Sequence, residues 1–218
     1  MFKQKRFWGL FLTIVLVMIG FKSFAETPPP PPDYFPLPVG GVWEYQAKTA
    51  DGKQSKLTVK VEGLETQSDG TTLYKTENNL GFAPFYIWYA KPNGLVKEYR
   101  QLYTFGGNNT EYRLEPAKTI LKNPPASGDT WTWEGQEIAV MTTEVKENYR
   151  VVGTEDIEVP AGKFSTFKVE IEGTKAGTPF KKVAWYGNFI GAIKWQIFDD
   201  KGTLKTTTEL EKYTFPPN

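Results

Sequence analysis

The sequence predicts an all-β protein, an antiparallel sandwich, barrel or half-barrel built from two duplicated β-units. Short stretches alternate apolar and polar residues with a period of two, as half-buried strands do. Turn signals that contain glycine separate these stretches at short intervals. An aromatic and glycine pattern of the first half also returns in the second half in the same order. Together these three observations favour a β-domain over a helical or mixed fold.

The first 25 residues have the features of a secretory signal peptide. Lys3, Lys5 and Arg6 form a basic start, an apolar run over residues 7–21 follows, and small residues mark a cleavage site after Ala25. An uncleaved membrane anchor is the alternative, but this run is shorter than the roughly 20 residues that a spanning helix needs. We therefore expect an exported protein, periplasmic or extracellular, with no transmembrane span after cleavage.

Residues 26–33 are predicted to form a proline-rich spacer. The segment "TPPPPPD" favours an extended polyproline II conformation, because proline fixes φ and lacks an amide donor. A stiff tether is one interpretation of this segment, and a ligand for an aromatic groove is the other.

Two segments of the mature chain show the strand pattern clearly, residues 56–64 and residues 167–173. A further corner is predicted at Pro160-Ala161-Gly162. Outside the leader, no window of a dozen residues has helical periodicity. Turns between strands are expected where a glycine follows a polar residue, at Asp51-Gly52, Asp69-Gly70, Asn93-Gly94 and Lys201-Gly202.

Two matches relate the halves of the chain. The segment "PVGGVWEY" (38–45) aligns with "ASGDTWTW" (126–133) at an offset of 88 residues. The segment "WYAKPNGLVK" (88–97) aligns with "WYGNFIGAIK" (185–194) at an offset of 97 residues. Internal duplication is the simplest explanation, and chance similarity in an aromatic-rich chain is the alternative.

If the halves are duplicated, they span about residues 34–113 and 126–218 and share one core. We therefore expect a single β-domain over residues 34–218. Residues 114–128 would connect the halves, with Pro116, Pro124 and Pro125 interrupting any strand.

Three segments carry a resemblance to a known group of proteins: "YFPLPVGGVWEY", "VPAGKFSTFKVE" and "WYGNFIGAIKW". In this order they resemble the signature of uncharacterised exported bacterial proteins and lipoproteins, over residues 34–197. The resemblance implies an exported β-domain and brings no assigned catalytic residue. This chain departs from the lipoproteins of the group because it lacks the cysteine that receives the lipid.

Composition excludes most familiar catalytic centres. The chain has no histidine and no cysteine, so it cannot form a Ser-His-Asp triad, a Cys-His pair or a nitrogen or sulfur zinc site. A serine-lysine dyad and calcium binding by Asp199 and Asp200 are weaker alternatives, the latter because an Asp pair before Lys-Gly is more typical of a turn. We expect no enzyme activity, no cofactor and no metal. Glycoside hydrolysis remains the alternative, because it needs only two carboxylates. Of the candidates, Glu44 and Glu134 are expected on the solvent face. The candidate carboxylates are Glu44, Glu98, Glu134, Glu137 and Glu144.

Aromatic residues are the positive signal, at 15% of the chain. In "PFYIWYA", Phe85, Ile87 and Tyr89 are expected on one face of a strand, with Tyr86 and Trp88 on the other. For the tryptophans of the two matches, a role in the core is the main alternative to ligand binding. The candidate ligand-facing aromatic residues are Phe85, Tyr86, Trp88, Trp131, Trp133 and Trp185.

The mature chain has 22 basic and 25 acidic residues once the four basic residues of the leader are removed, so we expect no nucleic-acid partner. We expect a non-catalytic binding or carrier module of the bacterial cell envelope, with a lipid or an envelope protein as the partner. An apolar ligand or an extended partner segment would occupy its aromatic lining. The alternatives are a carbohydrate-binding or glycoside-hydrolysing module and a structural partner-binding protein of the envelope.

Overall fold

The computed structural model describes residues 29–81 and 83–217. The chain divides into two compact units, Met1–Pro31 and Pro32–Asn218. Residues 29–31 of the first unit are exposed and have no regular secondary structure. The predicted signal peptide and residues 26–28 of the predicted spacer lie outside the described residues. Within the described residues, no helix has the length and apolar character that crossing a membrane requires.

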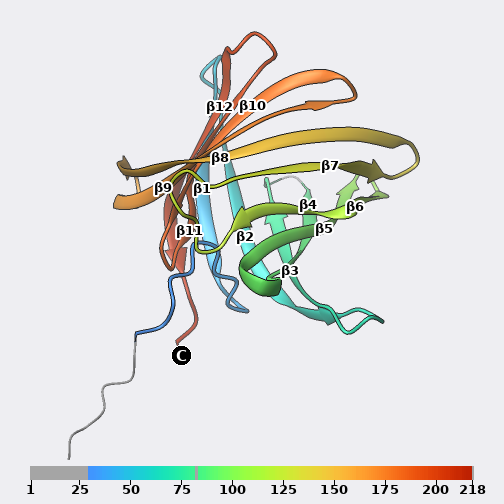
Figure 1. Ribbon diagram of the computed structural model, residues 1–218, viewed down its shortest axis with the longest axis horizontal. Coiled ribbons are helices and arrows are strands. Elements are labelled where there is room, and N and C mark those ends of the chain that lie inside the picture. The colour runs from blue at the N-terminus through green and yellow to red at the C-terminus, as the bar shows by residue number, and fades with distance from the viewer. Residues whose placement is uncertain (1–28, 82, 218) are drawn as a thin grey trace, which may run out of the picture. The chain divides into compact units, whose positions relative to one another are not determined.

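The second unit is an antiparallel closed barrel, drawn as a series of arrows in Figure 1. Strands that follow each other in the chain are neighbours in the sheet, and β1 pairs with β12 to close it. This confirms the all-β prediction and, among the three expected architectures, selects the barrel. The strands are β1 (Val42–Thr49), β2 (Gln54–Thr66), β3 (Thr72–Asn79), β4 (Pro84–Ala90), β5 (Leu95–Phe105), β6 (Asn108–Lys122), β7 (Thr130–Ile138), β8 (Thr142–Val159), β9 (Gly162–Lys175), β10 (Thr178–Gly187), β11 (Gly191–Phe198) and β12 (Leu204–Thr214), with one 3-10 turn, η1 (Pro92–Gly94), before β5.

Because every strand runs antiparallel to its neighbours, the connections alternate between two ends of the barrel. The turns that follow β1, β3, β5, β7, β9 and β11 lie at one end, which we call the mouth. The turns that follow the even-numbered strands lie at the other end, which we call the base. The segment before β1 leads into the barrel at the base, and the segment after β12 leaves it at the base.

All four predicted glycine turns connect consecutive strands, with φ values from 73° to 86° at their glycines. The turn at Asn93-Gly94 needs two residues with positive φ, since Asn93 has a φ of 52°. The predicted Pro160-Ala161-Gly162 corner joins β8 to β9. These turn predictions are confirmed. Such turns can be predicted from the sequence because each depends on residues next to one another in the chain.

The barrel consists of two sets of six strands, β1–β6 and β7–β12, and the two sets begin alike. Gly40 N donates to Val61 O over 2.8 Å, and Gly128 N donates to Val151 O over 2.9 Å. Both glycines have a φ of 86°. The register of strand pairing shifts just after each of the two valines. The first sequence match therefore lies at the start of both sets.

Trp88 lies on the fourth strand of the first set, on the outer face of the barrel. Lys75 of β3 and Arg100 of β5 pair with it in register on its two sides. The guanidinium carbon of Arg100 lies 4.0 Å from the centroid of the indole ring, and Lys75 Nζ lies 5.9 Å from it. The indole N–H of this buried tryptophan has no acceptor within the described part of the chain.

Trp185 takes the same place on the fourth strand of the second set. Lys168 of β9 and Lys194 of β11 pair with it in register, and their Nζ atoms lie 5.4 and 5.7 Å from the ring centroid. Unlike Trp88, Trp185 donates its indole N–H to Glu155 Oε2 over 3.2 Å. Both tryptophans of the second sequence match are thus covered by cations from the two neighbouring strands, which is a favourable cation–π arrangement.

The expectation that Pro116 interrupts any strand between the halves is wrong, because β6 continues through Pro116 to Lys122. The strand tolerates proline here because pairing with β7 covers only Arg113 to Glu115 and ends just before Pro116. The carbonyl of Pro116 instead accepts a hydrogen bond of 2.9 Å from Trp133 Nε1. Pro124 and Pro125 lie beyond the strand, as expected.

The alternation of side chains divides β4 as expected. Phe85, Ile87 and Tyr89 line the interior of the barrel. Tyr86 and Trp88 lie on the opposite face, where they pack in a separate small cluster with residues of β3 and β5. The interior face of the barrel therefore carries the larger apolar clusters and the candidate site.

Candidate ligand cavity

Residues 33–37, which we call the base segment, close the base of the barrel. Asp33 anchors the segment to three loops of this end. Its Oδ2 lies 2.5 Å from Lys91 Nζ, and its Oδ1 accepts a hydrogen bond of 2.7 Å from Asn123 Nδ2. Asp33 N donates to Asn188 Oδ1 over 2.9 Å, and Phe189 N donates to Asp33 O over 2.6 Å. Burial alone would raise the pKa of Asp33, but the hydrogen bonds from Lys91 and Asn123 outweigh it, so the pKa lies below its usual value.

Phe35 of the base segment projects into the barrel between two tyrosines. Its ring centroid lies 5.2 Å from that of Tyr89 and 6.4 Å from that of Tyr186. These tyrosines follow Trp88 and Trp185, so each Trp-Tyr pair sends its tryptophan outward and its tyrosine inward. Burial, with a smaller contribution from Glu98, raises the pKa of Tyr186 to about 12, so its hydroxyl stays neutral.

Between the base segment and the mouth, the barrel holds a cavity of about 520 Å³. Its apolar lining comes mainly from β1, β2, β4, β10 and β11 and includes Tyr45, Val59 and Ile87. Towards the mouth, the lining residues Tyr103 and Ile197 are each 40% exposed, so the cavity opens to solvent at this end. A concave site of this size with a largely apolar lining is typical of small-molecule binding sites.

Polar side chains from β5, β6, β8 and β10 gather on one side of the cavity. Glu147 is 8% exposed and accepts on both carboxylate oxygens. Lys118 Nζ lies 3.4 Å from its Oε1, and the Tyr149 hydroxyl donates to its Oε2. We call the set the polar cluster, and it consists of Glu98, Gln101, Tyr103, Lys118, Glu147, Tyr149 and Lys182.

Glu98 is the second buried carboxylate of the polar cluster, with an exposed fraction of 6%. Gln101 Nε2 donates to Glu98 Oε1, and the Tyr103 hydroxyl donates to Gln101 Oε1 over 2.9 Å. Burial alone would lower the pKa of Lys118, but attraction by Glu98 and Glu147 outweighs it, so the pKa of Lys118 lies above its usual value. Lys118 therefore serves as the common cation of both carboxylates.

Lys182 enters the same cavity from β10 and differs from Lys118 in having no partner. No described residue forms a hydrogen bond or an ion pair with its Nζ. Burial and the positive charge of Lys118 lower the pKa of Lys182, and the opposing attraction of Glu147 and Glu98 does not offset them. The polar cluster thus offers three N–H donors of one ammonium group to a ligand.

Sequence reasoning missed Lys118, Glu147 and Lys182, although a signal for them is present. In a strand, a charged residue that keeps the phase of the apolar residues must point to the same face. Glu147 lies in phase with the buried Val145 and Tyr149, and Lys182 lies in phase with Ala184. Charges that occupy inward positions in this way mark a polar site inside the barrel.

The structure separates the candidate carboxylates. Glu98 alone belongs to the polar cluster. Glu44 and Glu134 lie on the outer face as expected, with side chains 44% and 67% exposed. Asp199 stabilises the β11–β12 turn by accepting hydrogen bonds from the backbone N–H groups of Lys201 and Thr203. In the described part of the chain, no three acidic residues are arranged to hold a metal ion.

The six candidate aromatic residues divide between the two faces. Phe85 lines the cavity, whereas Tyr86, Trp88 and Trp185 lie on the outer face, away from it. Trp131 and Trp133 point inward and pack in the core next to the cavity. Their indole N–H groups donate to the carbonyls of Thr119 and Pro116, at 3.0 and 2.9 Å.

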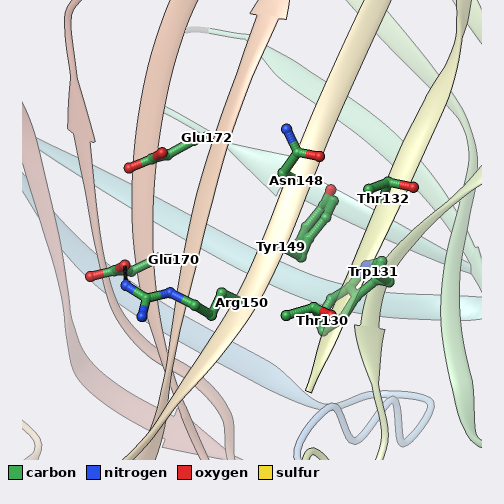
Figure 2. A pocket seen from close by; sticks show the side chains of 8 residues that line it. All are labelled: Thr130, Trp131, Thr132, Asn148, Tyr149, Arg150, Glu170 and Glu172. Carbon is green, nitrogen blue, oxygen red and sulfur yellow. Dashed lines mark hydrogen bonds and ion pairs between the residues drawn. The ribbon is translucent and has the colours of Figure 1, made fainter. Parts of the chain in front are cut away.

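A second hollow of about 310 Å³ lies on β7, β8 and β9. Figure 2 shows the side chains of the residues that line it. Trp131 and Tyr149 are among the residues that line it, and their rings stack with centroids 4.7 Å apart and planes 12° apart. Arg150 Nη2 lies 2.5 Å from Glu170 Oε2, but the Arg150 side chain is 62% exposed, so solvent weakens this pair. The charged residues of the hollow are paired and near solvent, so the barrel cavity is the better candidate site. The hollow is lined by Thr130, Trp131, Thr132, Asn148, Tyr149, Arg150, Glu170 and Glu172.

Comparison with known families and structures finds similarity to one family model and to several solved bacterial structures. A family model described as DUF3108-like matches residues 107–210, which include β6 to β11 and most of β12. No curated protein matches the chain. One solved structure has a TM-score of 0.55 and 16% identity, over 84% of this chain and 99% of its own. It is a protein from Bacteroides fragilis NCTC 9343, predicted to be exported and described as having a YmcC-like fold. This similarity shows the fold.

Two further solved structures have lower TM-scores. A predicted lipoprotein from Parabacteroides distasonis ATCC 8503 has a TM-score of 0.48 and 17% identity, over 85% of this chain and 100% of its own. The hypothetical lipoprotein YmcC from Escherichia coli K12 has a TM-score of 0.44 and 9% identity, over 84% of this chain and 90% of its own.

Proposed function

We propose that this chain is an exported, non-catalytic binding or carrier module of the bacterial cell envelope, and that its barrel cavity holds the apolar part of a ligand. The observation that carries this proposal is the cavity of about 520 Å³, bounded at the base by Phe35 and lined largely by aromatic and aliphatic side chains. Burial of apolar ligand surface there would contribute roughly 25 cal/mol per Å². Export is supported by the leader and by the likeness to a protein predicted to be exported.

The two ends of the barrel favour entry through the mouth. The base segment occupies the base, so a polypeptide segment has no path through the barrel and a ligand with a free end fits better. At the mouth, Val140 and Met141 in the β7–β8 turn are 96% and 79% exposed. Exposed apolar residues at this end of the barrel suit an apolar ligand that enters there.

Binding can be measured on the exported protein, purified from the periplasm and freed of lipid. Nile red, an uncharged dye that fluoresces in apolar surroundings, and dodecanol serve as probes, with native mass spectrometry to count bound molecules. We expect one dodecanol molecule per chain, displacement of Nile red by dodecanol, and a shift of tryptophan emission on binding. An unchanged mass and unshifted emission at saturating dodecanol would contradict the proposal.

A pair of neighbouring substitutions locates the binding site. Val59→Trp places a large ring into the cavity, whereas Thr58→Trp places the same ring on the outer face of the same strand. We expect Val59→Trp to weaken dodecanol binding by roughly tenfold or more and Thr58→Trp to leave it within a factor of two. Equal effects of the two substitutions would place the ligand elsewhere.

A further inference from the structure

The unpaired Lys182 indicates what kind of head group the ligand carries, an inference that rests on the proposed function. The buried groups around Lys182 are otherwise matched to one another. Both oxygens of Glu147 are occupied, by Lys118 and Tyr149, and Glu98 accepts from Gln101. In this set only the ammonium group of Lys182 has no acceptor.

An ammonium group has three donors and no acceptor, so in a low-dielectric site it gains most from an anionic oxygen. Lys182 is half-buried and lines the cavity, so a ligand that displaces water from its ammonium group without supplying an acceptor would leave that group unpaired, which is unfavourable. A neutral ligand would bring this cost, and a cationic ligand would also meet repulsion from Lys182 and Lys118. The carboxylates that could attract a cation, Glu147 and Glu98, already accept hydrogen bonds within the polar cluster. An anionic group at Lys182 avoids this cost.

The neighbours of Lys182 fix where the rest of the ligand lies. On β9 and β11 its partners in register are Ile171 and Ile197, and both line the cavity. On β10 itself, Phe180 and Ala184 precede and follow it on the same face. Lys182 thus lies where the polar cluster borders apolar lining, which suits a molecule with one charged end and a hydrocarbon body.

We propose that the ligand is a single-chain amphiphile whose anionic head group accepts hydrogen bonds from Lys182 Nζ, while its hydrocarbon chain lies against the apolar lining of β1, β2, β4 and β11. A carboxylate and a phosphate monoester share this chemistry. The polar cluster is then an anion site inside an otherwise apolar cavity, and it selects among amphiphiles by the charge of the head group.

The test compares four probes of equal chain length on the purified exported protein: dodecanoate, dodecyl phosphate, dodecanol and dodecylamine. Each is titrated against Nile red bound in the cavity, at pH 7.5. We expect dodecanoate or dodecyl phosphate to bind roughly tenfold or more tightly than dodecanol, and dodecylamine to bind most weakly. The ratio between dodecanoate and dodecyl phosphate tells the two anionic head groups apart.

Substitutions at two adjacent lysines give the control. Lys182→Met should bring the anionic probes to within about a factor of two of dodecanol, whereas Lys182→Arg should keep their advantage. Lys181→Met is the matched control, because Lys181 is the neighbouring residue of β10, lies on the outer face and pairs with Glu172 at 2.9 Å. It should leave all four affinities unchanged.

The possible outcomes separate the two proposals. If wild-type protein binds dodecanol and Nile red but shows no preference for the anionic probes, the anion site is refuted and the binding function stands. If Lys182→Met keeps the preference, the head group binds elsewhere and the assignment to Lys182 is wrong. If no probe binds, both proposals fail together. A thermal unfolding curve for each variant confirms that it is folded.

Discussion

The ring of Phe35 packs edge-on against the ring of Tyr89, with centroids 5.2 Å apart and ring planes at 64°. Tyr186 of the second half approaches the same phenylalanine at 6.4 Å. A residue that precedes the first strand thus joins the tyrosines of both Trp-Tyr pairs and closes the base of the cavity. The base segment is therefore part of the packed structure of the barrel.

Phe35→Ala should destabilise the protein, because it removes this aromatic packing and leaves the base of the cavity open. For a partly buried phenylalanine we expect a loss of about 2–4 kcal/mol in the free energy of unfolding. Urea unfolding followed by tryptophan fluorescence measures it. Phe189→Ala, at an aromatic residue of the same end that is 43% exposed, should cost less than about 1 kcal/mol. A Phe35→Ala cost as small as that of Phe189→Ala would show that the base segment is not packed.

Asp33→Asn should remove part of the pH dependence of stability. The folded pKa of Asp33 lies below its unfolded value, so its contribution is fully present above an unfolded pKa of about 3.8 and is lost as the pH falls through the folded pKa. We expect Asp33→Asn to cost roughly 1–3 kcal/mol at pH 7 and much less at pH 3. Urea unfolding at both pH values checks this. Asp156→Asn, at an exposed position of β8, is the control and should show no such difference.

Trp88→Phe and Trp185→Phe test the difference in hydrogen bonding between the two outer tryptophans. Both substitutions keep an aromatic ring between the flanking cations. Trp185→Phe also loses the hydrogen bond to Glu155, whereas Trp88→Phe removes an indole N–H that has no acceptor. Trp185→Phe should therefore cost about 1 kcal/mol more in the free energy of unfolding. A larger cost for Trp88→Phe, measured by the same chemical denaturation, would contradict the hydrogen bonding described here.

Lys182→Met should stabilise the ligand-free protein, because it replaces an unpaired ammonium group in the cavity by an apolar side chain of similar length. Because Lys182 is half-buried and keeps some contact with water, we expect a gain of about 1 kcal/mol or less at pH 7. The folded pKa of Lys182 is lowered, so the unfolded state binds more protons between the folded pKa and the unfolded value of about 10.5. Wild-type stability should therefore gain a contribution as the pH rises through this window, and the advantage of Lys182→Met should shrink.

Thermal or urea unfolding of the ligand-free protein between pH 7 and pH 10 measures this effect. Lys181→Met, on the outer face, should not stabilise the protein at any of these pH values. Destabilisation by Lys182→Met would mean that its ammonium group has an acceptor in the empty cavity, and the argument for an anionic ligand would lose its basis.

We infer that the two sets of six strands arose by duplication. The first and fourth strands of each set carry the matched residues, and Gly40 and Gly128 make the same backbone hydrogen bond to a valine of the next strand. Trp88 and Trp185 have cations in register on both sides. If the two sequence matches were due to chance, the matched residues would not be expected to lie on the same strands of both sets. Separate expression of β1–β6 and β7–β12 would test whether the sets still recognise each other.

Local sequence was sufficient to predict the all-β class, five of the turns and the faces of β4. The glycine turns depend on the φ angles of single residues, and the division of Phe85, Ile87 and Tyr89 from Tyr86 and Trp88 depends only on the period of a strand. The failure at Pro116 has a long-range cause. Whether proline breaks a strand depends on whether its missing N–H would face a partner strand, and β7 has already parted from β6 at this point.

The closed barrel and its polar cluster were decided only by the tertiary structure. Closure needs β1 to pair with β12, from the opposite end of the domain, and an alternating pattern fits a sandwich, a half-barrel and a barrel equally well. Periodicity places Glu147 and Lys182 on the inner face, but it cannot say which charges meet there. That Lys118 finds two carboxylates and Lys182 finds none depends on the register of β5, β6, β8 and β10 around the barrel, which the packing of all twelve strands sets together.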